Sequence, residues 1–167
     1  MEDAAEDLTA VVAARDDQDT IDVVSERFGT FAVSADSVLH FPQGPIGFPA
    51  DRRFVILEHR PGSPFKWLLS LDDPELGFAI ANPAELVSGY EPPLALAAQV
   101  LEVEEPDIAL FVIVTIPSDP RAMTVNLMAP VVVDMRTRRA RQLIVEGAKL
   151  DPRYPVLELS AEQETER

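Results

Sequence analysis

The sequence predicts a mostly β protein, an all-β domain built as a small antiparallel β-barrel or as two packed sheets with one or two short helices. From residue 20 onward, short runs rich in Val, Ile and Phe alternate with clusters of Pro and Gly, at intervals that suit strands and turns. The chain has 167 residues, a length that suits one domain, and 47% of them are hydrophobic, which is enough for a continuous core. We therefore expect a single β domain.

The first half of the chain contains six segments with the composition of strands. The longest breaker cluster, residues 42–49, holds three prolines and two glycines and is expected to form a shaped loop. Shorter clusters at 61–64 and 72–74 predict turns of a meander. The expected strands are 21–24, 29–33, 38–41, 53–58, 65–71 and 77–81.

The second half is expected to contain one short helix and four further strands. The helix follows Pro93, because good helix formers fill residues 94–101 and proline is favoured near a first helical turn. Residues 108–116 are almost continuously apolar, which predicts a strand buried on both faces at the centre of the core. The remaining expected strands are 123–127, 131–135 and 141–145.

The charge of the chain is strongly acidic and is concentrated at its ends. There are 29 Asp and Glu residues against 14 Lys and Arg, a net charge of -15. Residues 1–19 and 158–167 are the most acidic and have too little apolar surface to offset the entropy of ordering them. We therefore expect two disordered acidic tails around a domain at 20–157. The negative electrostatic potential of this net charge also disfavours direct binding to nucleic acid or to an anionic membrane.

The tails are predicted to be dispensable for folding. Deleting residues 1–19 and 160–167 should leave the unfolding midpoint nearly unchanged, because these segments offer no apolar stripe of useful size to the core. Denaturant melts of the full and truncated chains test this expectation. A substantial loss of stability in the truncated chain would mean that a tail docks on the body.

Several classes of chemistry are excluded by composition. The chain has no cysteine and its two histidines are His40 and His59, so disulfides, thiol nucleophiles, thiolate metal sites and three-histidine metal sites are impossible. It also lacks a nucleophile elbow, a phosphate-binding Walker loop, a dinucleotide fingerprint and a zinc-protease motif. The amino terminus does not resemble a signal peptide, and no apolar run is long enough to span a membrane. We expect a cytoplasmic protein without catalytic residues, metal or cofactor.

One enzymatic alternative stays open. Asp72 and Asp73 are adjacent carboxylates, which can serve acid–base chemistry when one raises the pKa of the other. Together with His40 they would supply polar groups for a small ligand or a reaction at the mouth of a barrel. The competing interpretation is a turn in which the aspartates bind the backbone, with both histidines structural or solvated.

Residues with possible roles in binding a protein partner lie in three places. The glycine- and proline-rich loop either holds two apolar side chains exposed at little entropic cost or buries them as a plug in the core. A run of arginines between two strands is either a solvated hairpin end or a contact for an acidic partner. An asparagine among apolar residues either bonds the local backbone or orients a partner peptide. These candidates are Ile46, Phe48, Asn126, Arg136, Arg138, Arg139 and Arg141.

Four sequence fragments follow one another in a distinctive order. They read FGTF at 28–31, FPxGPIGF at 41–48, FxWLxSLDDP at 65–74 and TVNLxAPVVV at 124–133. In this order and spacing, from about residue 20 to residue 155, the chain resembles the bacterial flagellar assembly factor FliW family. It departs from the usual family pattern at Leu69, Asp134 and Ala140, where the family has Gln, Asn and Gly, and in its Gly-Pro-Ile-Gly-Phe order, where the family has Gly-Ile-Pro-Gly-Phe.

The resemblance implies a non-enzymatic cytoplasmic protein that binds flagellin before export. It also implies binding to CsrA, the RNA-binding translational repressor of flagellin, so that free flagellin feeds back on flagellin synthesis. We expect the free protein to be a monomer. From its charge we further expect the acidic body to lower the RNA affinity of bound CsrA partly by electrostatic repulsion, while the arginine run contributes to docking.

Overall fold

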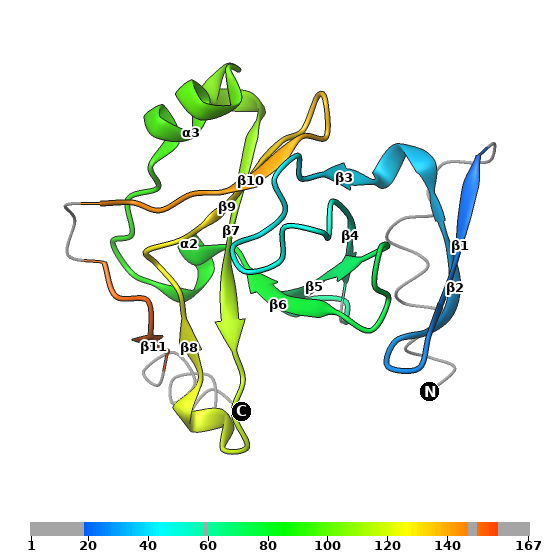
Figure 1. The fold of residues 1–167 in the computed structure, drawn as a ribbon. Coiled ribbons are helices and arrows are strands. Elements are labelled where there is room, and N and C mark those ends of the chain that lie inside the picture. The colour runs from blue at the N-terminus through cyan, green and yellow to red at the C-terminus, as the bar shows by residue number, and fades with distance from the viewer. Residues whose placement is uncertain (1–18, 59, 147–149, 157–167) are drawn as a thin grey trace.

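A computed structural model shows one long antiparallel sheet and a separate two-stranded hairpin (Figure 1). The structure describes residues 19–58, 60–146 and 150–156. His59 and nearly all of both predicted tails therefore lie outside the described residues. The predicted mostly β, two-sheet architecture is confirmed. Within the described part of the chain, no helix is long and apolar enough to cross a membrane.

The hairpin pairs β1 (Thr20–Ser25) with β2 (Gly29–Ser34), and the larger sheet runs in the order β10-β9-β7-β6-β5-β4-β3, with β8 paired to β7 and β11 paired to β8. The strands of the larger sheet are β3 (Leu39–His40), β4 (Arg53–Glu58), β5 (Phe65–Ser70), β6 (Gly77–Ala81), β7 (Ile108–Thr115), β8 (Thr124–Val125), β9 (Val131–Asp134), β10 (Ala140–Gln142) and β11 (Tyr154–Pro155). The helices are α2 (Pro83–Leu86) and α3 (Leu94–Leu101), with 3-10 turns at Ala35–Ser37, Glu105–Asp107 and Pro120–Ala122.

The two end strands of the larger sheet meet at a single point. The His40 N–H donates to the Arg138 carbonyl at 2.8 Å, and His40 forms one parallel bridge with Arg139. Strand β3 goes no further, because Phe41 is followed by Pro42, which has no N–H to offer a neighbouring strand. The sheet thus curls but does not close into a barrel, so of the two predicted arrangements the structure has the two-sheet one.

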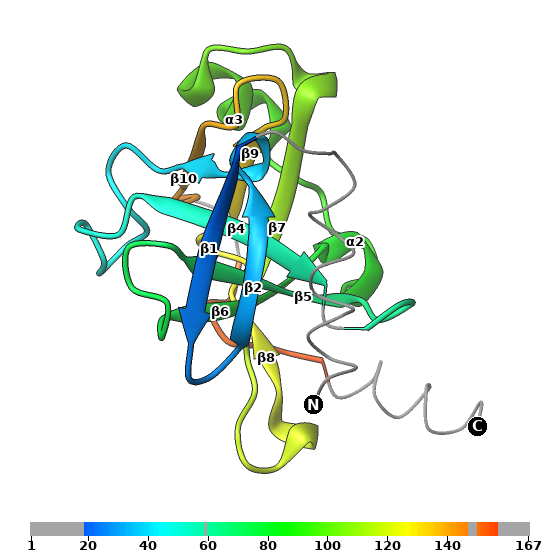
Figure 2. The ribbon, with the colours of Figure 1, turned by 90° about the vertical axis from the view of Figure 1, so that its right-hand side faces the viewer.

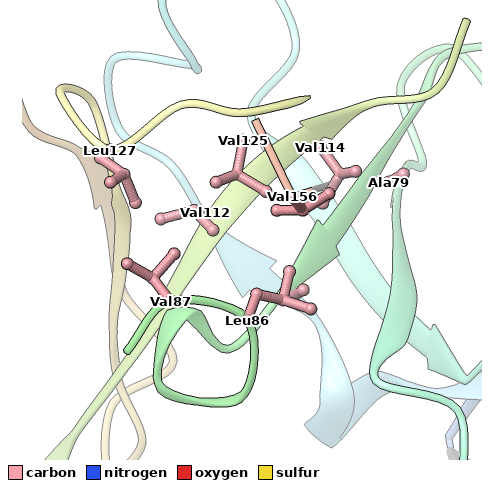
Figure 3. Close-up of a cluster of buried hydrophobic side chains, with 9 residues drawn as sticks. Ala79, Leu86, Val87, Val112, Val114, Val125, Leu127 and Val156 are labelled. Atoms are coloured by element: carbon pink, nitrogen blue, oxygen red, sulfur yellow. The ribbon is translucent and has the colours of Figure 1, made fainter. Parts of the chain in front are cut away.

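The core is divided among four buried clusters. The β1–β2 hairpin lies across β4 and β5 and buries Val23, Phe31 and Val33 against them (Figure 2). Helix α2 covers the middle of β7, where Leu86 and Val87 meet valines from β7 and β8 (Figure 3). The cluster inside the curled sheet consists of Leu39, Phe41, Phe54, Leu68, Ile80, Val131, Val133 and Ala140. The cluster beneath α3 consists of Ala97, Leu101, Val132 and Leu143.

The expectation that residues 108–116 form a strand buried on both faces is only partly right. Strand β7 occupies most of that range and pairs with β6, β8 and β9, but its buried side chains are Val112 and Val114. The pairing with β6 begins only at Val112, whereas residues 108–111 pair with β9. The first half of the strand is therefore less enclosed than a continuous apolar run suggests.

Candidate partner-binding groove

Most of the predicted arginine run lies in the turn between β9 and β10, with Arg141 in β10 itself, and the buried Asp134 shapes the turn. The Asp134 carboxylate accepts hydrogen bonds from the Arg136 N–H at 3.0 Å and from the Thr137 hydroxyl at 2.6 Å. Burial raises the pKa of Asp134, but these hydrogen bonds lower it by more, so the pKa lies below its usual value. The turn ends at Arg138, which adopts a left-handed φ of 65°.

The structure divides this arginine run between two different cavities beside α3. The Arg136 guanidinium lies 3.8 Å from an Asp107 carboxylate oxygen and lines a polar cavity near the end of α3. Arg139 and Arg141 lie instead beside the loop at 42–49, where both line a small cavity of about 70 Å³. Arg139 and Arg141 therefore share a surface with that loop, and Arg136 does not.

A groove of about 690 Å³ follows the outer edge of β10 between this loop and α3. Its apolar lining includes Ile46 from the loop, Leu96 from α3 and Ile144 just after β10. Their exposed fractions are 51%, 38% and 55%, so three large apolar side chains from distant parts of the sequence are open to solvent in one place. Such a patch is typical of a surface that binds another molecule.

The loop is held in shape by one glycine and one glutamine. Gly44 has a φ of +69°, and a Cβ there would meet the Phe48 carbonyl oxygen and approach the Pro49 Cα to 2.7 Å. The Gln142 side chain accepts a hydrogen bond from the Ile46 N–H at 2.9 Å and donates one to the Ala129 carbonyl at 3.0 Å. Gln142 thus ties the loop wall of the groove to the segment just before β9.

Phe48 combines the two roles considered for it. Its ring packs edge-on against Phe78, with centroids 5.4 Å apart, yet the residue is 37% exposed. The side chain therefore covers the end of the core without being enclosed in it. Phe48 stands beside the groove rather than among the residues that line it.

Replacing Phe48 with alanine is expected to lower the free energy of unfolding by about 1 kcal/mol, the value of one aromatic pair with partial burial. Denaturant unfolding measures this loss, and titration with a partner protein measures any accompanying loss of affinity. A loss of about 3 kcal/mol or more would instead identify Phe48 as a plug of the core.

Asn126 lies in a different place, in the turn that leads into β9. Its side-chain oxygen accepts hydrogen bonds from the Met128 N–H at 3.0 Å and the Ala129 N–H at 3.1 Å. These bonds shape the backbone locally, and Asn126 does not line the groove.

Asp72 and Asp73, the carboxylates considered for an enzyme at a barrel mouth, accept hydrogen bonds from backbone N–H groups. The Asp72 carboxylate accepts hydrogen bonds from the backbone N–H groups of Arg52 and Arg53 at 2.7 and 3.0 Å. It also forms an ion pair with the Arg53 side chain, whose Nε lies 3.0 Å away. Burial raises the pKa of Asp72, but these partners lower it by more, which is opposite to what a general acid needs. Asp73 accepts from the Glu75 N–H at 3.2 Å, and His40 is exposed in β3 opposite Arg53.

Most of the residues that line the groove were not predicted from the sequence to belong to a site. Leu96, Val100, Gln142 and Ile144 line it, and none of them was among the predicted site residues. One signal was available, because successive residues of a strand face opposite sides, so the apolar run 143–145 must point at least one side chain away from the core.

The fold and the groove together define a small, curled antiparallel β domain that leaves one sheet edge and an apolar surface open. Residues 22–157 match the family described as FliW protein, and the chain belongs to this family of flagellar assembly factors. It is 35% identical over 147 residues to the flagellar assembly factor FliW of Geotalea uraniireducens, covering 86% of this chain and 88% of that protein. It is 36% identical over 136 residues to the FliW of Bdellovibrio bacteriovorus, covering 80% and 78%.

A solved structure agrees with this assignment. The crystal structure of the flagellar assembly factor FliW superposes with a TM-score of 0.74 at 28% sequence identity. The superposition covers 81% of this chain and 96% of that one.

Proposed function

We propose that this protein is a cytoplasmic, non-enzymatic assembly factor that binds flagellin and antagonises a CsrA-type RNA-binding repressor, so that flagellin synthesis follows flagellum assembly. The observation that carries the proposal is the family match over residues 22–157, which includes nearly the whole described domain. The open apolar groove supports a role in binding a protein chain. The structural roles of Asp72 and Asp73 favour binding over catalysis.

Titration calorimetry with purified proteins tests both halves of the proposal. The full chain is titrated with monomeric flagellin and, separately, with CsrA. Saturable binding of each is expected, together with release of CsrA, or recovery of its RNA binding, when flagellin is added. Absence of flagellin binding would refute the assembly-factor role, and absence of CsrA binding would refute the feedback role.

Antagonism of RNA binding should be partly electrostatic. The net charge of -15 brings many carboxylates close to an RNA-binding surface, and charges about one Debye length apart, roughly 10 Å at 0.1 M salt, still repel a polyanion collectively. The RNA affinity of CsrA, measured alone and in complex across a salt series, is expected to show a penalty that shrinks as salt rises. A penalty that does not change with salt would indicate steric blocking instead.

A further inference from the structure

The outer edge of β10 and of residues 143–145, which continue it, has backbone groups that no strand in the described part of the chain satisfies. Just after β10, the Leu143 and Val145 N–H groups donate to the carbonyls of Pro130 and Met128, each at 2.8 Å, so these odd-numbered residues face the segment that leads into β9. Alternate residues of an antiparallel strand point their N–H and C=O groups in opposite directions. The backbone groups of Gln142 and Ile144 therefore point away from β9, and in the described part of the chain no backbone group pairs with them.

This edge is free because the sheet stops short of closing. Strand β3 reaches β10 only at the bridge between His40 and Arg139, and the chain then turns away at Pro42 into the loop that forms one wall of the groove. The place that a longer β3 would occupy is the groove itself. An exposed strand edge of this kind is a template for another extended chain.

The side chains beside the edge specify what such a chain would carry. Ile46, Val100 and Ile144 offer apolar contacts along the groove. Arg141 lines the same groove, and Arg139 lines the adjoining cavity. Within residues 19–58, 60–146 and 150–156, neither of these two guanidinium groups forms an ion pair. The surface therefore suits a strand with apolar residues at alternate positions and a carboxylate near the arginines.

We propose that flagellin docks here by adding one extended, apolar and acidic segment to the edge of β10. The inference rests on the proposed function, because it assigns the flagellin-binding site. Pairing of two copies of this chain edge to edge is disfavoured, since it would bring the Arg139 and Arg141 side chains of both copies together. This proposal assigns Arg139 and Arg141 to flagellin, whereas we expected from the sequence that the whole arginine run contributes to docking CsrA.

Amide hydrogen exchange, followed by NMR on the full chain, reports strand addition directly. In the free protein the Leu143 and Val145 amides are expected to exchange slowly and the Gln142 and Ile144 amides quickly. Saturation with monomeric flagellin should slow exchange at Gln142 and Ile144. Unchanged exchange at both amides in the saturated complex would overturn the proposal.

Substitutions separate the backbone pairing from the side-chain contacts. Ile144→Pro removes the outward N–H, and Ile144→Ala keeps it while removing the same apolar contact. Proline is tolerated at an edge where the N–H faces solvent, so thermal melts should show both variants folded. We expect Ile144→Pro to weaken flagellin binding about tenfold beyond Ile144→Ala. Equal affinities of two folded variants would refute strand addition.

The charge contribution is tested by Arg141→Glu against Arg153→Glu, an identical change at an exposed residue away from the groove. Arg141→Glu should weaken flagellin binding about tenfold, and less at high salt, while Arg153→Glu binds normally.

The outcomes distinguish this site from the proposed function. If flagellin binds the unaltered chain but no groove variant changes its affinity, the site is wrong and the proposed function stands. If flagellin does not bind the unaltered chain, the proposed function fails as well. A chain that is dimeric alone, and monomeric with Ile144→Glu, would assign the groove to a second copy and overturn the proposal.

Discussion

Replacing Phe54 with alanine is expected to lower the free energy of unfolding by about 4 kcal/mol, within the range measured for buried phenylalanines. Phe54 is 0% exposed at the centre of the cluster inside the curled sheet. Its ring packs edge-on against Phe41 with centroids 4.9 Å apart and lies 6.3 Å from the ring of Phe78. The surrounding strands cannot collapse into the space that alanine leaves, so the loss includes a cavity. Denaturant unfolding monitored by circular dichroism measures it.

Phe48→Ala is the matched control for this change. The same atoms are removed, but from a side chain that is 37% exposed and has one ring neighbour. The loss at Phe54 should exceed the loss at Phe48 by severalfold, because only Phe54 is enclosed. Equal losses at the two positions would contradict the packing of the core described above.

Replacing Asp134 with alanine is expected to cost about 2 kcal/mol at neutral pH, since hydrogen bonds to a charged acceptor are lost and the Arg136 N–H and Thr137 hydroxyl are left without it. The buried carboxylate holds the turn from which Arg138 and Arg139 project. Asp22→Ala, a change at an exposed carboxylate on β1, is the control and should have little effect.

The loss at Asp134 should depend on pH. The pKa of Asp134 is lower in the folded protein than its ordinary value near 3.8, so the folded state favours the charged carboxylate. The resulting stabilisation is complete above the unfolded pKa and disappears as the pH falls through the lower folded pKa. Unfolding free energies of the unaltered chain and Asp134→Ala should therefore differ most above pH 5 and converge towards pH 2. A difference that stays constant over this range would contradict the role given to the carboxylate.

Local patterns predicted the meander well. The expected strands at 53–58 and 77–81 and the helix at 94–101 match β4, β6 and α3, because each has a clear apolar pattern bounded by proline or glycine. Segments whose extent depends on a partner strand were too long. Residues 38–41 and 123–127 were expected as full strands but form only the two-residue strands β3 and β8. The single turn of α2 and the short β11 have too few residues to produce a period and were not predicted.

Only part of the candidate site could be predicted, because local sequence patterns do not show which distant segments meet. Ile46, Arg139 and Arg141 were singled out from composition, and the structure places them around one surface. Nothing local in the sequence reveals that Ile144 lies across from Ile46. That juxtaposition follows from the curl of the whole sheet, and from Gln142 binding the Ile46 N–H.

The near closure of the sheet also sets an order of events in folding. Hairpins β4–β5 and β5–β6 join segments adjacent in the sequence, so they close short loops and can form early. The bridge between His40 and Arg139 joins two distant parts of the chain, so closing it costs more entropy than closing either hairpin. Closure at this bridge is therefore expected to be a late step, and a single isolated bridge is expected to open readily in native-state fluctuations. Until this bridge forms, the outer edges of β3 and β10 are both unpaired. These two edges are therefore where a nascent chain is most exposed to mispairing with another strand.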